Sequence, residues 1–245
     1  MLKEQKVGGK TNMEKVIIFD GDDTLWKTQE LYDNTKAQFK ELMVSEGFNE
    51  DVVVILDNID AERVKILKFS KSRFLESMLI TYAILIGKYQ KSWNIEIERK
   101  IRDYAQSVFK FPPILYDDTI DVLKELSQKF ILVLFTSGDK EIQEEKINSL
   151  GKAFLSFFSK IYITEIKTEE EYKKIIDDLD VSKENIYVVG NSVKSDINPA
   201  LKLGLKAILL QRKTWKYEED KLFSDKVLIA SSLTNVKNLI LEELQ

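Results

Sequence analysis

The segment VIIFDGDDTLW, residues 16–26, carries the strongest structural signal in the chain, because it joins an apolar run to a cluster of carboxylates. An unbroken run of Val, Ile and Phe is typical of a strand buried on both faces of a parallel sheet. Gly21 and its acidic neighbours favour a turn directly after this strand. Side chains at positions i and i+2 of extended backbone point to the same side, so we expect Asp20 and Asp22 to project together.

Similar apolar runs recur in the second half of the chain, and the intervals between them carry amphipathic helical patterns, as in residues 119–126 and 170–179. Thr168 and Glu171 fit a capping box that starts a helix and leaves Lys167 in the preceding loop. This alternation predicts an α/β fold with a Rossmann-like, doubly wound parallel sheet. Its strands are expected at residues 16–19, 131–135, 161–163, 186–189, 206–210 and 227–230.

The interval 28–111 breaks this alternation, because it is helical in pattern and nearly free of turn residues before Pro112 and Pro113. Apolar residues recur within it at helical spacing, which indicates a packed helix face. We therefore expect an inserted α-helical subdomain at residues 28–111. The α/β core is expected to comprise residues 13–27 and 112–245, and the polar residues 1–12 to form a flexible N-terminal extension.

Two residue types are missing from the 245-residue chain, which contains no Cys and no His. Their absence rules out disulfides, thiolate nucleophiles, zinc fingers, Ser-His-Asp triads and imidazole general bases. The side chains that remain available for catalysis are carboxylates, hydroxyls and Lys. A bound metal is expected to be a hard cation held by oxygen, which means Mg²⁺ or Mn²⁺ rather than zinc or iron.

The formal net charge is -4, and the basic residues are mostly interspersed Lys. Because phosphate backbones bind clustered positive charge, we expect no nucleic-acid partner. The chain has no apolar run of the roughly 18 residues that a membrane helix needs, and residues 1–15 do not resemble a signal peptide. We expect a cytoplasmic protein without a membrane partner, and the sequence leaves its oligomeric state open.

Polar residues follow the predicted strands where the carboxyl ends of parallel strands form one edge, the usual ligand site of such sheets. Three carboxylates at this edge would repel one another unless cations intervene, and a divalent metal and a Lys ammonium would supply that charge. Such a site offers a carboxylate nucleophile, a second carboxyl for proton transfer and donors for an anionic group. The residues are Asp20, Asp22, Thr136, Ser137, Lys167, Asn191 and Asp196.

Four segments that contain these residues resemble, in their order along the chain, the four motifs of the haloacid dehalogenase-like (HAD) superfamily. VIIFDGDDTLW is similar to the first motif, a strand followed by Asp-x-Asp-x-Thr, and ILVLFTSGD to the second, a strand ending in Thr or Ser. Lys167 resembles the third, and YVVGNSVKSDINPALKLG the fourth, whose usual form is Gly-Asp followed by a second acid. The helical interval falls where that family inserts a cap. Four ordered motifs are a far more specific signal than one Asp-x-Asp.

The resemblance implies a phosphoric monoester hydrolase that acts on a small phosphorylated metabolite. Asp20 would attack phosphorus and form an aspartyl phosphate. Asp22 would protonate the leaving oxygen and then deprotonate the hydrolytic water. Thr136, Ser137 and Lys167 would hold the phosphoryl oxygens.

The resemblance also implies Mg²⁺ as cofactor, held by the Asp20 carboxylate, the Asp22 backbone carbonyl and the fourth motif, where Asn191 and Asp196 are the candidates. Asn191 departs from the family pattern, because an Asp usually stands there. An amide oxygen can ligate Mg²⁺ but brings no full negative charge, so we expect weaker metal binding.

Three functions stay open on these residues. A phosphatase is favoured because Asp22 supplies the acid and base that hydrolysis requires, whereas a dehalogenase is disfavoured because that branch lacks the acid at this position. A phosphomutase on the same scaffold and a non-catalytic phosphate-sensing or protein-binding module are the alternatives. The inserted subdomain is expected to select the substrate, with Trp26, Arg73 and Tyr82 as candidate contacts.

Overall fold

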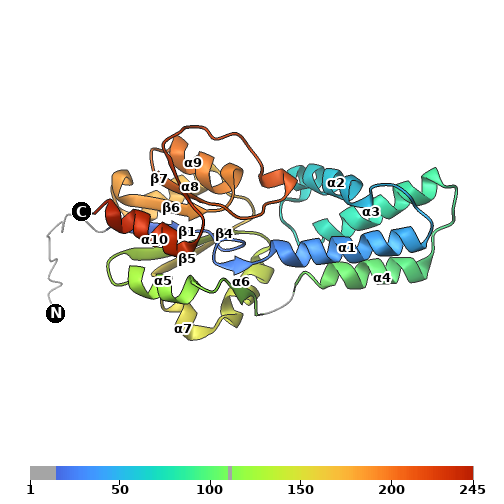
Figure 1. The fold of residues 1–245 in the computed structure, drawn as a ribbon, viewed down its shortest axis with the longest axis horizontal. Helices are drawn as coiled ribbons and strands as arrows, with labels where there is room; N and C mark the ends of the chain where they lie inside the picture. The colour runs from blue at the N-terminus through green and yellow to red at the C-terminus, as the bar shows by residue number, and fades with distance from the viewer. Residues whose placement is uncertain (1–14, 110–111, 245) are drawn as a thin grey trace, which may run out of the picture.

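The computed structural model describes residues 15–109 and 112–244, so the predicted extension at residues 1–12 lies outside them. Figure 1 shows an α/β unit at one end of the molecule and four long helices at the other. The strands are β1 (Val16–Phe19), β2 (Trp26–Lys27), β3 (Ile114–Leu115), β4 (Ile131–Ser137), β5 (Lys160–Thr164), β6 (Ile186–Gly190), β7 (Lys206–Leu210) and β8 (Val227–Ala230). The helices are α1 (Gln29–Ser45), α2 (Val52–Leu67), α3 (Arg73–Lys88), α4 (Ile95–Gln106), α5 (Thr119–Leu126), α6 (Lys140–Ser149), α7 (Gly151–Leu155), α8 (Glu169–Leu179), α9 (Asn198–Lys202) and α10 (Leu233–Glu242).

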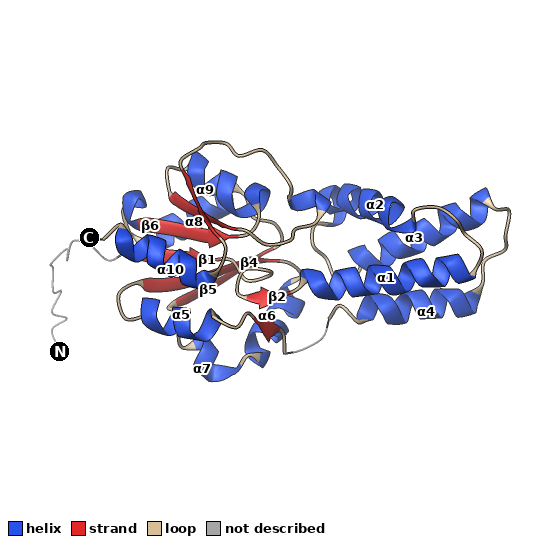
Figure 2. Cartoon of the chain, viewed as in Figure 1, coloured by secondary structure: helices blue, strands red, loops and turns tan. Residues whose placement is uncertain are grey.

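Six strands form one parallel sheet in the order β5-β4-β1-β6-β7-β8, which confirms the predicted Rossmann-like α/β fold (Figure 2). β1 lies between β4 and β6, so the chain moves outward first to one side of β1 and later to the other. The carboxyl end of β1 is therefore the point where the strand order reverses, and open α/β sheets bind ligands at such a point. All six predicted strands are present, and β4, β5 and β6 extend slightly beyond the predicted bounds.

The two faces of the sheet are covered by different helices because side chains alternate along each strand. Ile17 and Phe19 of β1 pack in a buried cluster with residues of α5, α7 and α10. Val16 and Ile18 pack on the opposite face with residues of α8. At roughly 25 cal/mol per Å² of apolar surface, these two clusters supply most of the stabilisation of the α/β unit.

Helices α1 to α4 occupy the chain between β2 and β3 and have a buried apolar cluster of their own, which includes Phe39, Phe74 and Tyr82. We call residues 29–106 the four-helix insertion. Both of its ends are held by a short antiparallel ribbon, in which Trp26 pairs with Leu115 and Lys27 with Ile114. This ribbon was not predicted, because two-residue strands leave no periodic pattern in a sequence.

Only one of the two hydrogen bonds of the capping box predicted at the start of α8 is formed. The Thr168 hydroxyl accepts a hydrogen bond from the Glu171 backbone at 3.3 Å, as a helix N-cap does. The Glu171 carboxylate pairs with Lys174 at 2.5 Å instead of reaching back to Thr168. The N-cap alone is enough to start the helix at Glu169 and to leave Lys167 just before it.

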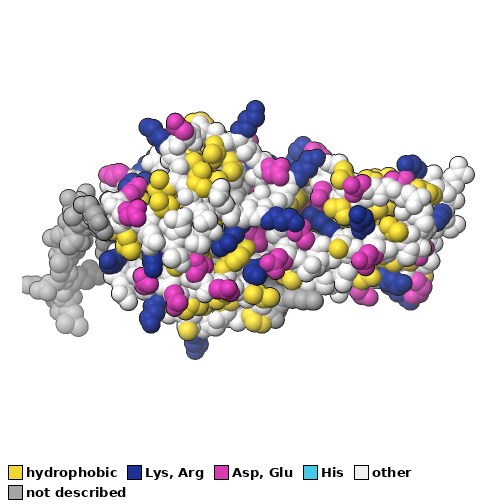
Figure 3. Space-filling model, in the orientation of Figure 1, with side chains coloured by type: hydrophobic (Ala, Val, Ile, Leu, Met, Phe, Trp, Pro, Cys, Tyr) yellow, Lys and Arg dark blue, Asp and Glu magenta, His cyan; other side chains and the backbone are white. Residues whose placement is uncertain are grey.

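On the face shown in Figure 3, basic and acidic side chains are interspersed, as the sequence predicted for its Lys residues. Within residues 15–109 and 112–244, no helix is both long and apolar enough to cross a membrane.

Candidate active site

A cavity of about 150 Å³ lies at the carboxyl ends of the strands, and residues of both the sheet and the four-helix insertion line it. Most residues singled out from the sequence meet here, although they come from segments far apart in the chain. Those that line the cavity are Asp20, Asp22, Ser137, Lys167, Asn191, Asp196 and Arg73.

Asp20 follows β1 at the centre of the sheet, where its backbone N–H donates to Val189 O at 2.9 Å. Lys167 Nζ bridges two carboxylates, at 2.5 Å from Asp20 Oδ1 and 2.6 Å from Asp196 Oδ1. Burial raises the pKa of Asp20 to about 7, the Lys167 charge opposes this rise, and the Asp196 charge adds to it. A second cation beside Asp20 would therefore favour its ionised, nucleophilic form.

Lys167 and Asp196 are both almost fully enclosed. Burial disfavours the Lys167 ammonium, but the charges of Asp196 and Asp20 hold the pKa of Lys167 above its usual value. Asp196 Oδ2 accepts from the Ser192 backbone at 3.1 Å, so both Asp196 oxygens already have donors. Asp196 thus fixes the position of the Lys167 ammonium.

Asp22 accepts hydrogen bonds from four side chains. Trp26 Nε1 at 2.8 Å, Lys146 Nζ at 2.6 Å and the Thr28 hydroxyl all donate to Oδ1, and Gln143 Nε2 donates to Oδ2 at 2.8 Å. Burial alone would raise the pKa of Asp22, but the Lys146 charge and these hydrogen bonds lower it below its usual value. Asp22 is accordingly held as a carboxylate.

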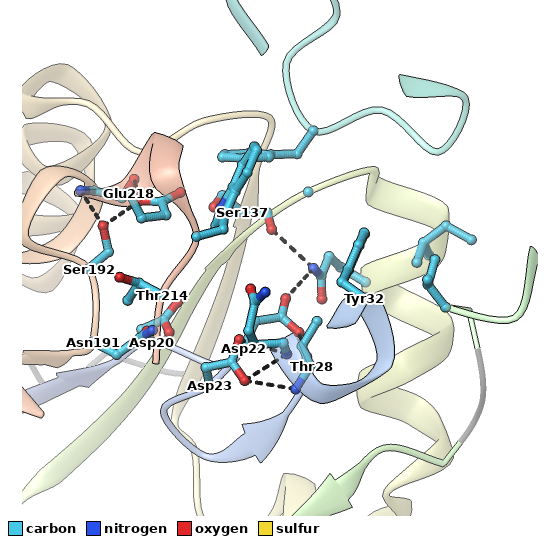
Figure 4. Close-up of a pocket in the computed structure, with 18 of the residues that line it drawn as sticks. Asp20, Asp22, Asp23, Thr28, Tyr32, Ser137, Asn191, Ser192, Thr214 and Glu218 are labelled. Carbon is cyan, nitrogen blue, oxygen red and sulfur yellow. Dashed lines mark hydrogen bonds between the residues drawn. The ribbon is translucent and has the colours of Figure 1, made fainter. Parts of the chain in front are cut away.

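Asp23 lies in the turn that follows Asp22, and its backbone φ of 58° is in the left-handed region. Its carboxylate accepts from the Thr28 and Gln29 backbones at 2.9 Å, so it shapes the loop, as Figure 4 shows beside Asp22. Thr24 stabilises the opposite side of the same loop by donating to Asn191 Oδ1 at 3.2 Å. This bond leaves a lone pair on the Asn191 amide oxygen for another partner.

The end of β4 supplies Thr136 and Ser137. Ser137 lines the cavity, and its carbonyl accepts from Gln143 Nε2 at 3.0 Å. Thr136 is fully buried, and its hydroxyl has no hydrogen-bond partner among the residues that the structure describes. A buried hydroxyl without a partner is uncommon in folded proteins, and it would gain from an acceptor brought by a ligand.

Glu218, in the 3-10 turn Lys216–Glu218 between β7 and β8, also lines the cavity. Figure 4 shows it joined to Ser192, and it accepts from the Ser195 hydroxyl at 2.6 Å as well. Burial raises the pKa of Glu218, and the two hydroxyl donors oppose that rise. Glu218 therefore fastens the loop after β6 to the loop after β7.

Two substrate candidates from the sequence are corrected by the structure. Trp26 is fully buried and does not line the cavity; its indole packs against Gly21, where an added Cβ would lie 2.3 Å from the ring. Tyr82 is buried in the four-helix insertion, where its hydroxyl accepts from the Asn94 backbone at 3.2 Å. Both rings are structural, and only Arg73 reaches the cavity.

Sequence reasoning missed Gln143, Lys146 and Glu218. Gln143 and Lys146 lie three residues apart on α6, so they share one helix face, and α6 follows directly on β4. This spacing next to a predicted strand end could have pointed to them. Glu218 lies in an irregular loop and has no sequence signal of this kind.

The chain belongs to the haloacid dehalogenase-like hydrolase family, whose sequence model matches residues 14–204. This match confirms the resemblance found in the four motifs and makes the protein a hydrolase of that family.

Two characterised relatives are phosphatases. The chain is 27% identical over 235 residues to a glyceraldehyde 3-phosphate phosphatase of Methanocaldococcus jannaschii. This alignment covers 93% of this chain and 99% of the relative. The chain is also 27% identical over 212 residues to the N-acylneuraminate-9-phosphatase of Mus musculus, which covers 79% of this chain and 80% of the relative.

Solved structures show the same fold. A haloacid dehalogenase-like hydrolase from Xanthomonas campestris superposes with a TM-score of 0.75 at 18% identity, covering 94% of this chain and 95% of that one. The L-2-haloacid dehalogenase of Xanthobacter autotrophicus superposes with a TM-score of 0.63 at 15% identity, covering 93% and 98%. At such identities, the likeness concerns the fold alone.

Proposed function

We propose that this protein is a Mg²⁺-dependent phosphatase that hydrolyses a small phosphomonoester through an aspartyl phosphate on Asp20. The observation that carries the proposal is the place of the Asp20 carboxylate, which follows the central strand, faces the cavity and lies 2.5 Å from Lys167 Nζ. A nucleophile here can reach phosphorus while a fixed ammonium neutralises the phosphoryl oxygens. The phosphatase relatives support the same reaction.

Asp22 is suited to proton transfer because it stands two residues from Asp20 and lines the same cavity. Asp22 is ionised in the free site, and the negative charge of a phosphate bound beside it would raise the pKa of its carboxyl, so Asp22 would take up a proton as the substrate enters. It would give this proton to the leaving alcohol oxygen, and the resulting carboxylate would then take a proton from the attacking water. Hydrolysis returns Asp20 to its free form, so both carboxyl groups end the cycle as they began.

Phosphate oxygens would be held by three groups around Asp20. Lys167 supplies a buried positive charge, and Ser137 lines the cavity at the end of β4. Thr136 is the third group: its buried hydroxyl has no partner in the described chain, but Thr136 does not line the cavity, so the end of β4 would have to shift for a phosphoryl oxygen to reach it.

The oxygen atoms around Asp20 fit Mg²⁺, although the described residues contain no group of three or more acidic side chains placed to hold a metal by themselves. Asp196 and the Asp22 carboxylate already have donors. The Asp20 carboxylate, the Asn191 amide oxygen and the Asp22 backbone carbonyl would therefore be the protein ligands, completed by water. When bound, the cation supplies charge neutralisation between the anionic nucleophile and the anionic phosphate.

The four-helix insertion would act as a cap that covers the cavity. It contributes Tyr32, Arg73 and Phe69 to the lining, and the Lys71 ammonium reaches Glu141 on α6 at 2.9 Å. We propose residues 28–111 as the cap and residues 13–27 and 112–245 as the catalytic core. A covered cavity excludes bulk water from the attack on phosphorus and favours small substrates over phosphoproteins.

The test is a panel of phosphomonoesters assayed for inorganic phosphate with and without Mg²⁺, using wild type, Asp20→Asn and the control Asp177→Asn, whose side chain is exposed on α8. We expect Mg²⁺-dependent release from wild type and the control, and release at the level of buffer alone from Asp20→Asn with an unchanged circular dichroism spectrum. Near-normal activity of Asp20→Asn would refute the covalent mechanism. Transfer to an added sugar phosphate without free phosphate would instead identify a phosphomutase.

A further inference from the structure

The cap side of the cavity contains two buried cations, Lys36 on α1 and Arg73 at the first position of α3. Only 5% of Arg73 is exposed, yet it lines the cavity. Its guanidinium forms an ion pair with Asp60, a carboxylate that also accepts from the Ser77 hydroxyl at 2.7 Å. Asp60 also lines the cavity, so this ion pair fixes the orientation of Arg73 at the cavity wall before any ligand arrives.

Arg73 has N–H donors left over. Its Nε–H is buried and has no acceptor in the part of the chain that the structure describes. A buried donor without an acceptor forgoes the free energy of a hydrogen bond, which is larger still for a charged group. An acceptor brought by a ligand would recover that energy.

Two aromatic rings lie beside the Arg73 guanidinium. The Arg73 guanidinium carbon lies 5.0 Å from the Trp215 ring centre and 5.8 Å from that of Phe69, and both rings line the same cavity. Ring faces attract the guanidinium charge but are poor substitutes for an oxygen acceptor, so these contacts leave the unpartnered Nε–H edge of Arg73 to a ligand oxygen. A planar carboxylate matches such an edge better than a hydroxyl or an aldehyde does.

Charge in the cavity is distributed unevenly. The core side is lined by six carboxylates and two ammonium groups, whereas the cap side is lined by two cations, Lys36 and Arg73, and one carboxylate, Asp60. Each of these cations has a carboxylate partner, Asp57 for Lys36 at 2.6 Å and Asp60 for Arg73. Arg73 differs in presenting a planar set of donors that includes the unpartnered Nε–H, which suits a planar anion better than the point charge of an ammonium does. A second anionic group of a substrate would meet the least repulsion on the cap side.

The cavity volume limits the size of the ligand. The space for water-sized groups in the cavity is about 150 Å³, which favours a compact ligand with its phosphate at Asp20 and its second anionic group at Arg73.

We propose that Arg73 binds the carboxylate of the substrate, and that the substrate is a short phosphorylated carboxylic acid with its phosphate at Asp20. This inference rests on the proposed phosphatase function, because it uses Asp20 as the phosphate end of the site. It assigns a specificity role to Arg73 and a chemical class to the substrate.

Three compounds with the same three-carbon phosphate test the proposal: 3-phosphoglycerate has a terminal carboxylate, glyceraldehyde 3-phosphate an aldehyde and glycerol 3-phosphate a hydroxymethyl group. We expect wild type to show a kcat/KM for 3-phosphoglycerate at least about tenfold above either neutral analogue, as the loss of one charged hydrogen bond predicts. Equal or better hydrolysis of the neutral analogues would overturn the proposal and leave the phosphatase function standing.

Variants then assign the preference to Arg73. In Arg73→Met the ratio of acid to neutral kcat/KM should fall to about one, and Arg73→Lys should retain part of it because the charge remains but the planar fork is lost. Arg99→Met is the matched control, since Arg99 lies in the same insertion with an exposed side chain that pairs with Glu96. A full acid preference in Arg73→Met would refute the assignment, and so would a lost preference in Arg99→Met.

A binding measurement separates this inference from the proposed function. Titration calorimetry of Asp20→Asn with 3-phosphoglycerate and glycerol 3-phosphate compares affinities without turnover, and the acid should again bind at least about tenfold more tightly. If wild type releases phosphate from no compound but this difference persists, the phosphatase proposal fails and the ligand class stands. Equal affinities would reject the ligand class.

Discussion

Lys146 Nζ lies 2.6 Å from Asp22 Oδ1, inside the cavity that also contains Asp20. The pair joins the second turn of α6 to the loop after β1, and both side chains are largely buried. Gln143, one turn earlier on α6, holds the other Asp22 oxygen at 2.8 Å. Two residues of one helix face therefore determine where the Asp22 carboxyl points before a substrate arrives.

Removal of the ammonium in Lys146→Met should raise the pKa of Asp22. In wild type, the Lys146 charge is the largest effect that favours the ionised Asp22 carboxylate, whereas burial opposes ionisation. Without Lys146, the effect of burial is opposed only by the remaining hydrogen bonds. Titration of the Asp22 carboxyl carbon by ¹³C NMR should show its midpoint at higher pH, and kcat should fall about tenfold as the group loses its orientation. Lys140→Met, on an exposed side chain of the same helix, is the control. An unchanged Asp22 midpoint would show that the ion pair does not govern its ionisation.

Asn191→Asp should tighten metal binding. A unit charge pair about 4 Å apart is worth on the order of 4 kcal/mol at an effective dielectric of about 20, and desolvation cancels much of it, which leaves roughly 1 to 2 kcal/mol. The Mg²⁺ concentration for half-maximal phosphate release should therefore fall about tenfold, with a smaller effect on the rate at saturating Mg²⁺. Asn148→Asp adds the same charge at an exposed position of α6 and should leave the titration unchanged. Identical Mg²⁺ curves for wild type and Asn191→Asp would remove Asn191 from the metal ligands.

Fixing the cap to the core should stop turnover. Lys71, just before α3, pairs with Glu141 on α6 at 2.9 Å, and the chain has no natural Cys to interfere with thiol chemistry. The double variant Lys71→Cys with Glu141→Cys, joined by a short thiol-reactive cross-linker, should lose multiple turnovers because a closed cavity cannot exchange product for substrate. Each single variant treated with the same reagent should stay active. Full activity of the cross-linked protein would show that the cap need not open.

A methyl group at Gly190 should destabilise the fold and the site together. A Cβ at this position would lie 2.2 Å from Asp196 Oδ2, so the carboxylate that orients Lys167 must shift. We expect Gly190→Ala to cost about 1 to 3 kcal/mol, with a lowering of Tm by roughly 2 to 4 °C per kcal/mol. Gly87→Ala is the matched control, since nothing lies within 4 Å of a Cβ there and helical Ala gains about 0.5 to 1 kcal/mol over Gly. Equal Tm values for the two variants would contradict the steric argument.

The sheet was predictable because each central strand is an apolar run that parallel sheets bury on both faces. Asp20 and Asp196 could be placed near Lys167 because the carboxyl ends of neighbouring strands meet at one edge. The family match confirms that interpretation of the motifs.

The remaining site residues depend on packing that a single sequence does not encode locally. Lys146 reaches Asp22 because of how α6 is rotated about its own axis. Glu218 reaches the cavity because of the path of a loop that has no periodic structure. Trp26 was expected to be a candidate substrate contact, but the absence of a side chain at Gly21 lets the indole pack against the loop.

The ribbon of β2 and β3 brings the two ends of the four-helix insertion into adjacent positions, with Lys27 opposite Ile114. Whatever lies between these two strands starts and finishes at nearly the same point, so its length and helix count can change without moving β1 or β4. The core residues proposed for phosphoryl chemistry and the helices that line the substrate pocket can therefore change independently of each other. Descendants of such a chain can exchange one pocket for another while Asp20 and Lys167 keep their positions.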